Sequence, residues 1–341
     1  MADARQGYPM PNLKLTLACW DYDRTRALFD GRIKPPGIDL ELWSTRNVGE
    51  IMERMLRGRQ FDVAELGITY YLRSLELMDA PFIAIPVFPN RFFRHSAIFV
   101  NAGKSIQSPR DLSGRRVGEL LRYGHDAGIW AKGALSDEFG VAASSMTHYV
   151  GGMDRTPAGP DWAPLAPPPD VTIVQLTADQ GLDRMLEAGE IDALFTAHVP
   201  PSARRRPDRV RRLFADFEDV ERDYFQRTGI FPIMHTVVIR REVYERNRWI
   251  ARALLDAFEE AKQLAIKAYS VGDMFFNAPS MIPWFVSLRE KNRALMGDDF
   301  WPYGIAANRK TLETCLRYHR EQGILKRSYR IDDLFASETL D

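Results

Sequence analysis

The chain has 341 residues, enough for two lobes or one large domain, and its 45% hydrophobic and 27% charged residues are typical of a soluble globular protein. Lys and Arg together number 46, as do Asp and Glu, so the formal net charge is zero. This balance argues against a general binder of nucleic acid or of acidic membranes, and any electrostatic selection of a ligand must be local.

The N-terminal stretch shows no secretory signal, because its apolar run begins after residue 12 and is interrupted by Lys14 and then by Asp21. No stretch of the chain approaches the roughly 20 apolar residues of a membrane helix. We therefore expect a cytoplasmic protein without membrane contact.

The first hundred residues alternate strands with helices, which is typical of a parallel-rich α/β sheet. The helix over 47–56 is amphipathic and ends at Gly58. The expected strands are 13–20, 37–43, 61–66, the apolar run 82–87 and 97–100, and the expected helices are 22–29, 47–56 and 69–78.

A second α/β unit begins near Ser105. It is expected to hold strands over 116–120, 146–150 and 191–196, helices over 127–139 and 177–188, and a proline-rich surface loop over 156–170. The pattern of the first unit then returns, with an apolar strand over 231–239 and a helix over 242–269. The second unit is thus inserted in the first, the chain crosses near residues 100 and 205 at a hinge, and a ligand cleft is expected at the carboxyl ends of the strands.

Residues 91–95 are the most informative segment, because two guanidiniums, an imidazole and two aromatic rings follow an apolar run directly. A buried charge needs a partner, and Arg beside an aromatic plane suits a flat anionic molecule. In an extended strand Arg91 and His95 would share one face and Arg94 would lie on the other. A salt-bridge network between the lobes is the alternative.

Two more candidates follow strands of the first unit. Trp20 and Asp21 come at the end of the first strand, where aromatic and carboxylate groups would line a cleft, although Asp21 or Asp23 could instead cap the next helix. Glu65 stands in an apolar strand end, so it is either salt-bridged or held with a raised pKa.

In the second unit, Tyr123, His125 and Asp126 lie between a strand and a helix, where free backbone N–H groups bind carboxylates or phosphates. The alternative is that Asp126 caps the helix. His235 stands in the apolar strand over 231–239, as either a ligand-site residue or a satisfied core histidine. His148, His198 and His319 have no such context and are expected to be structural or exposed.

Other patterns argue against cofactors and metals. Cys19 and Cys315 form no metal-binding spacing, and there is no GxSxG, HExxH or dinucleotide-binding glycine motif. His95, His235 and Glu65 could gather a divalent metal, but no spacing requires it. An arginine-rich stretch over 204–212 is interpreted as a solvated loop, with a subunit contact in a homo-oligomer as the alternative.

The chain resembles the 4,5-dihydroxyphthalate decarboxylase family nearly end to end. The similar stretches include FDVAEL, PFIAIPVFPNRFFRH, FPIMHTVVIRR and DFWPYGIAANRKTLET. The resemblance implies a two-lobed α/β fold of the periplasmic binding protein type II kind, with lobe I at 1–101 and 206–341 and lobe II at 102–205. It also implies a cytoplasmic, cofactor-independent decarboxylase of a hydroxylated aromatic acid.

Family members usually have a Thr-Ala pair leading into the helix after Tyr123, where this chain has Gly124-His125-Asp126-Ala127-Gly128. The departure leaves the substrate open. Under the decarboxylase hypothesis His235 or Glu65 donates the proton, with His95 as a third catalytic candidate, and the other of the first pair takes a hydroxyl proton. Arg91 or Arg94 would hold a spectator carboxylate, and the helix start near Asp126 a second anion. A solute-binding or sensor protein for a small carboxylate and another lyase are the competing hypotheses.

Overall fold

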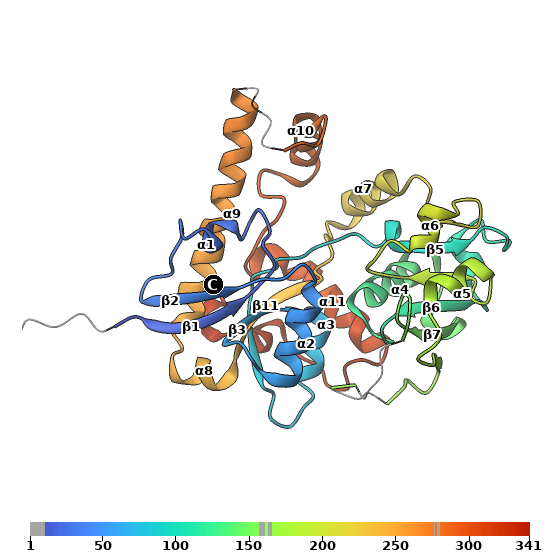
Figure 1. Ribbon diagram of the computed structural model, residues 1–341, viewed down its shortest axis with the longest axis horizontal. Helices are drawn as coiled ribbons and strands as arrows, with labels where there is room; N and C mark the ends of the chain where they lie inside the picture. Colours follow the sequence, from blue (N-terminus) through green and yellow to red (C-terminus); the bar gives the residue numbers. More distant parts are fainter. Residues whose placement is uncertain (1–10, 157–160, 163–165, 276, 278–279) are drawn as a thin grey trace, which may run out of the picture.

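The computed structural model describes residues 11–156, 161–162, 166–275, 277 and 280–341, which form two lobes built on separate sheets. Figure 1 shows the first sheet in one lobe and β5 to β7 with α4 to α7 in the other. The architecture is α/β, as the sequence predicts. Within the described ranges no helix is both long and apolar enough to cross a bilayer.

The first lobe has a five-stranded sheet in the order β2-β1-β3-β11-β4. Strand β1 pairs in parallel with β2 and β3, whereas β11 runs antiparallel to β3 and β4. The strands are β1 (Leu13–Ala18), β2 (Ile38–Trp43), β3 (Val63–Gly67), β4 (Phe82–Ile85) and β11 (His235–Arg240). Strands β3, β4 and β11 are buried along nearly their whole length, which explains their largely apolar sequence.

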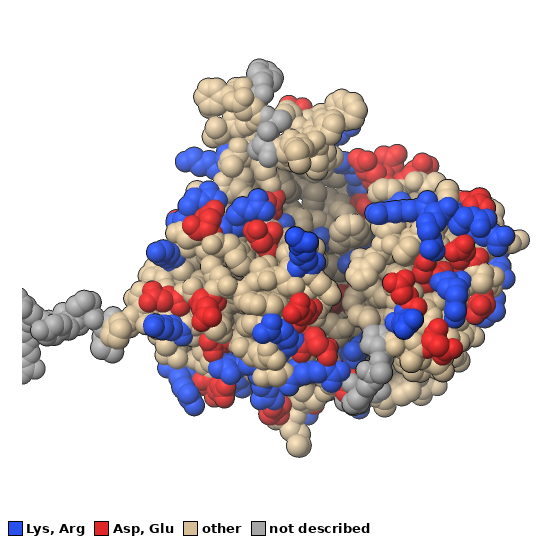
Figure 2. All heavy atoms as spheres, in the orientation of Figure 1, with Lys and Arg blue, Asp and Glu red and all other residues tan. Residues whose placement is uncertain are grey.

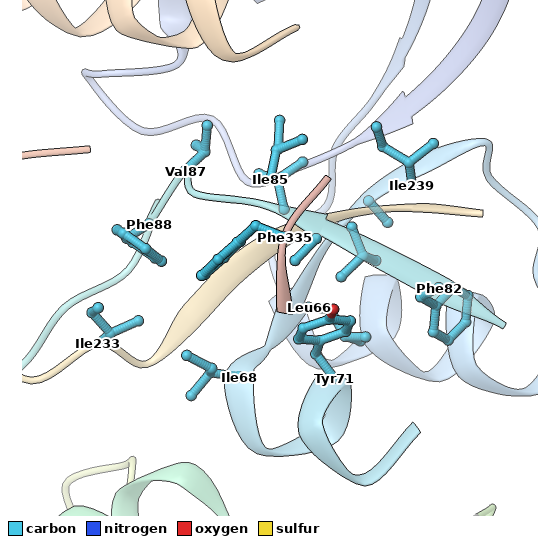
Figure 3. Packing of buried hydrophobic residues seen from close by; sticks show 14 of the residues in the cluster. Leu66, Ile68, Tyr71, Phe82, Ile85, Val87, Phe88, Ile233, Ile239 and Phe335 are labelled. Atoms are coloured by element: carbon cyan, nitrogen blue, oxygen red, sulfur yellow. The ribbon is translucent and has the colours of Figure 1, made fainter. Parts of the chain in front are cut away.

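Helices and aromatic side chains cover this sheet. Figure 3 shows Tyr71, Phe82, Phe88 and Phe335 packed with aliphatic side chains of β3, β4 and β11 in the core of the first lobe. The helices are α1 (Arg26–Phe29), α2 (Val48–Gly58), α3 (Ile68–Ser74), α8 (Arg241–Arg246), α9 (Ile250–Met274), α10 (Phe285–Met296) and α11 (Arg309–Glu321).

The second lobe has a six-stranded sheet in the order β10-β5-β9-β6-β7-β8. Strands β6 to β9 pair in parallel, and β5 runs antiparallel to both β9 and β10. The strands are β5 (Ile98–Asn101), β6 (Arg116–Leu120), β7 (Thr147–Gly151), β8 (Thr172–Gln175), β9 (Ala193–Phe195) and β10 (Val210–Arg212), and the helices are α4 (Asp126–Phe139), α5 (Leu182–Ala188), α6 (Pro201–Arg205) and α7 (Phe217–Thr228).

The inserted sheet extends beyond the 102–205 expected from the sequence. Strands β5 and β10 lie just outside that range, and they pair with each other and not with the first sheet. The chain therefore changes sheets between β4 and β5 and again between β10 and β11.

Helix α4 of the second lobe packs directly on α11 of the first. The rings of Trp130 and Tyr318 lie 5.5 Å apart, and the indole N–H of Trp130 donates to the carbonyl of Ile233 at 2.9 Å. The close approach depends on Gly133, because a Cβ there would lie 2.2 Å from the Tyr318 ring. The two lobes thus share a packed contact besides the two chain crossings.

The end of α9 and helix α10 project from the first lobe (Figure 1). Several large apolar side chains are exposed on this projection, namely Met274, Phe275, Met281, Ile282 and Trp284. Elsewhere on the face shown in Figure 2, Lys and Arg are interspersed with Asp and Glu, in keeping with the zero net charge.

Most predicted elements are present with shifted ends. The helix expected over 242–269 is two helices, α8 and α9, and the helix expected over 177–188 begins only at Leu182. Residues 91–95 are not a strand, since Arg91 makes one isolated bridge with Ile233 and His95 starts a single 3₁₀ turn. The predicted loop over 156–170 lies partly outside the described residues.

Candidate functional site

A cleft of about 910 Å³ lies between the two lobes at the carboxyl ends of strands from both sheets. Figure 2 shows the molecule hollowed between the lobes. Trp20 follows β1, Tyr70 follows β3, Arg122 follows β6 and His198 follows β9, and all four line the cleft. This is the position in which open α/β sheets bind ligands.

A glutamate and a histidine from neighbouring strands meet beneath the cleft. Nδ1 of His235, the first residue of β11, lies 2.5 Å from Oε1 of Glu65 in β3. The carboxylate also accepts hydrogen bonds from the Tyr22 hydroxyl at 2.7 Å, the Trp20 backbone N–H at 2.9 Å and the Cys19 thiol at 3.3 Å. Burial alone would raise the pKa of Glu65, but the hydrogen bond from His235 and the other donors outweigh it and lower that pKa below its ordinary value.

Glu65 is therefore an ionised acceptor, and this fixes the histidine tautomer. Nδ1 of His235 must carry the hydrogen that it shares with the carboxylate, so Nε2 is left to take or give a proton on the cleft side, which His235 lines. Glu65 itself is fully buried and does not line the cleft. Glu65 therefore fixes the orientation of the His235 ring, and of the two residues only His235 lines the cleft.

Arg94 is the buried cation of the cleft. It is 8% exposed and lines the cleft, and its Nε and one terminal nitrogen donate to the Met234 sulfur at 3.1 and 2.6 Å. In the described part of the chain no carboxylate lies within 4.0 Å of it. Burial lowers the pKa of Arg94 to about 10, so the guanidinium is still charged at neutral pH and would gain from an anionic ligand.

Arg91 and His95 lie outside the cleft. The Arg91 guanidinium is buried and donates to the carbonyls of Phe231 at 3.0 Å and Pro302 at 2.7 Å. His95 Nε2 lies 3.1 Å from Glu138. The expectation that Arg91 and His95 form one ligand-facing surface was wrong, because it assumed a strand that the chain does not form, and Arg94 takes the cleft position instead.

Two further candidates from the sequence also lie elsewhere. Asp21 is exposed and pairs with Arg26 at 3.2 Å. Tyr123 packs beneath the cleft wall, with Nζ of Lys132 3.6 Å from the centre of its ring and the ring of His148 5.1 Å away. Lys132 in turn binds Glu119 at 2.7 Å in a fully buried ion pair, so the Tyr123 ring packs against this ion pair.

The predicted anion site at the start of α4 is occupied by the protein's own side chains. His125 caps this helix, with Nδ1 accepting from the Ala127 N–H at 3.4 Å, and burial lowers its pKa to about 4, so its imidazole is neutral at pH 7. Asp126 accepts from the Thr69 N–H at 2.6 Å, so it caps α3 of the other lobe and not its own helix. Both residues line the cleft, as the sequence predicts.

Aromatic rings form much of the remaining wall. Trp20 and Phe92 are partly exposed in the cleft, and Tyr70 contacts His125 and Trp162 edge to face at 6.3 and 6.0 Å. Sequence reasoning missed Tyr70, Trp162 and His198. Tyr70 and His198 come just after β3 and β9, so the rule of strand carboxyl ends would have found them.

No three His, Cys, Asp or Glu side chains gather as a metal site among the described residues. His95 does not join His235 and Glu65, so the three residues considered for a metal from the sequence are not together.

Comparisons with known proteins agree with this architecture. No model of a known protein family matches the chain. It is 32% identical over 332 residues to the 4,5-dihydroxyphthalate decarboxylase of Comamonas testosteroni, which covers 97% of this chain and 99% of the relative. It is also 30% identical over 223 residues to the enzyme of the same name from Pseudomonas putida, covering 65% of this chain and 85% of that relative.

Solved structures of binding proteins share the fold at low sequence identity. The periplasmic aliphatic sulphonate binding protein of Escherichia coli aligns with a TM-score of 0.53 at 15% identity, over 96% of this chain and 99% of that one. A putative periplasmic sulfonate-binding protein from Methylobacillus flagellatus aligns with a TM-score of 0.54 at 13% identity, over 95% and 92%. The chain therefore has the periplasmic binding protein fold and belongs to the 4,5-dihydroxyphthalate decarboxylase family.

Proposed function

We propose that this protein is a non-oxidative decarboxylase of a hydroxylated aromatic carboxylic acid. The observation that carries the proposal is the pair of Glu65 and His235, which presents one imidazole nitrogen to a cleft with aromatic walls and a buried arginine. The curated relatives are named as decarboxylases, which supports the same reaction class.

The cleft has the parts that such a substrate needs. Arg94 attracts an anionic ring, and Trp20 and Phe92 offer apolar surface to its faces. His235 supplies the proton, and Glu65 holds its ring in one orientation and stabilises its protonated form.

The reaction step conserves charge and atoms. Nε2 of the protonated His235 transfers its proton to the ring carbon that bears the carboxylate, helped by electron density from a ring hydroxyl. The bond between that carbon and the carboxylate breaks, its electron pair restores the aromatic ring, and carbon dioxide leaves. The imidazole is then neutral and regains a proton from water. Loss of the carboxylate charge is favoured in a cleft that is partly closed to water.

The test is the release of carbon dioxide from a panel of hydroxylated benzoates and phthalates. We expect His235→Gln to lower kcat at least about 100-fold. The matched control is His95→Gln, because His95 also pairs with a glutamate, at 3.1 Å, but lies outside the cleft, so this variant should keep its activity. If the wild type binds such an acid in calorimetry and releases no carbon dioxide, the protein is a solute-binding protein for that ligand and not its decarboxylase.

Two expectations from the sequence stay predictions. Cytoplasmic location is checked by cell fractionation, and assembly into a homo-oligomer by light scattering of the purified chain. Neither is needed for the chemistry proposed above, because the described residues of one chain form the cleft.

A further inference from the structure

Asp126 places a carboxylate of the protein itself in the substrate cleft. It is the first residue of α4, is only 2% exposed, and lines the cleft together with Arg94. Its negative charge is close enough to Arg94 to favour the charged guanidinium, although the two make no ion pair. One cation and one anion of the protein therefore already stand in this part of the cleft.

The position of this carboxylate is fixed by the first lobe. Its Oδ1 accepts from the Thr69 N–H at 2.6 Å, and its Oδ2 lies so close to Gly67 that a Cβ there would be 2.4 Å away. Thr69 is fixed in turn, because its hydroxyl lies 2.8 Å from Nε2 of His319, whose Nδ1 donates to the Cys315 carbonyl at 2.7 Å. A side chain held in this way cannot turn aside for an incoming anion.

The other charges of the cleft are largely matched within the protein. Arg57 pairs with Glu53, Arg122 shares Asp161 with the buried Arg73, and a protonated His235 is matched by Glu65. Arg46 is exposed at the rim. Apart from Arg46, this leaves Arg94 and Asp126 as the charges of the cleft without an ion-pair partner. An aromatic acid with one carboxylate can satisfy Arg94, whereas a second carboxylate beside the first is repelled by Asp126.

We infer that the cleft selects hydroxylated aromatic acids with a single carboxylate, and that Asp126 is the residue that discriminates against a second one. This inference rests on the decarboxylase function proposed above and names the substrate class within it. This substrate class differs from the ring with two carboxylates that the names of the curated relatives specify.

The first test compares 3,4-dihydroxybenzoate with 4,5-dihydroxyphthalate, which carry the same hydroxyl groups and differ by one carboxylate. Initial rates are measured in separate assays, because loss of one carboxylate converts the second acid into the first. We expect kcat/KM to favour the monocarboxylate by about tenfold or more, the scale of one like-charge contact in a partly buried site. An equal or greater kcat/KM for the dicarboxylate would overturn the inference and leave the decarboxylase proposal standing.

The second test is Asp126→Asn, which keeps an acceptor for the Thr69 N–H and removes the charge. We expect the ratio of kcat/KM to shift toward the dicarboxylate by about tenfold. Glu138→Gln, on the same helix and outside the cleft, is the matched control and should leave the ratio unchanged. An unchanged ratio in Asp126→Asn refutes the role of Asp126.

Measurements of equilibrium binding distinguish failure of the decarboxylase proposal from failure of the inference about Asp126. If neither acid releases carbon dioxide, the decarboxylase proposal fails for these ligands, and calorimetric titration of the same two acids still decides the inference. Tighter binding of the monocarboxylate to the wild type, reduced in Asp126→Asn, supports it, and tighter binding of the dicarboxylate overturns it.

Discussion

Glu65 and His235 meet at 2.5 Å across neighbouring strands, with the carboxylate on the buried side and the imidazole on the cleft side. The pairing is antiparallel, and it sets the last residues of β3 beside the first residues of β11. In the proposed reaction, the imidazole that donates the proton is thereby held by a carboxylate that is fully buried.

Replacement of Glu65 by Gln should therefore lower the rate of carbon dioxide release more than it weakens substrate binding. The amide keeps the size of the side chain but loses the charge that stabilises a protonated His235, so we expect kcat to fall about 10-fold to 100-fold with a smaller change in KM. Steady-state rates of carbon dioxide release measure this. A rise in KM alone, with kcat preserved, would contradict the positioning role.

The two arginines of the 91–95 segment should behave differently. Arg94→Met removes the cation of the cleft, so we expect weaker ligand binding, by about 1.5–3 kcal/mol for a charged hydrogen bond, with little loss of stability. Arg91→Met leaves the carbonyls of Phe231 and Pro302 without their donor, so its free energy of unfolding should fall by about 2 kcal/mol. Calorimetric titration and urea unfolding of both variants distinguish the two effects, and the opposite pattern would show that Arg91 is the ligand-binding residue.

The buried ion pair of Lys132 and Glu119 should be important for stability. Lys132→Met leaves the Glu119 carboxylate in the core without its cation, and we expect the free energy of unfolding to fall by about 3–5 kcal/mol. The double variant with Glu119→Gln removes both charges and should recover part of that loss. Urea unfolding measures all three proteins, and a double variant less stable than Lys132→Met would contradict this account.

Stability should also fall in mild acid through His319. Burial lowers the pKa of this imidazole from 6.5 to about 4, so between these pH values the unfolded chain binds a proton that the folded chain does not. The free energy of unfolding therefore falls as pH drops from about 6.5 to 4, by roughly 3 kcal/mol for this group. In His319→Gln the dependence on pH should be shallower over that interval, as measured by urea unfolding at each pH. Parallel curves for the two proteins would refute the assignment.

The sequence predicted the elements well where hydrophobic periodicity is strong. It failed where pairing between distant segments determines whether a segment is a strand. The strand expected over 61–66 and the helix expected over 47–56 are local patterns, and both are present, as β3 and α2 with slightly shifted ends. Strand β10 has three residues within an arginine-rich stretch, and only its pairing with β5 makes it a strand. That long-range pairing moved the lobe boundary, which no local signal marks.

At the site, the sequence predicted which residues take part better than it predicted which way their side chains point. Glu65, Arg94, His125, Asp126 and His235 all lie in or directly beneath the cleft. Which of Arg91 and Arg94 lines the cleft depends on an irregular turn, and the alternation of side chains applies only to a regular strand. The partner of Asp126 lies 57 positions away in the chain, on the other lobe, so no local pattern could reveal it.

The packing of Trp130 on Tyr318 also limits how the molecule can move. Spreading the lobes about the two crossings would expose both rings and break the hydrogen bond from Trp130 to Ile233, at a cost of a few kcal/mol. We therefore expect the lobes to move little when a ligand binds, so that little of the binding free energy is spent on closing the cleft. The radius of gyration in solution, measured by small-angle scattering, should accordingly be the same with and without a bound acid.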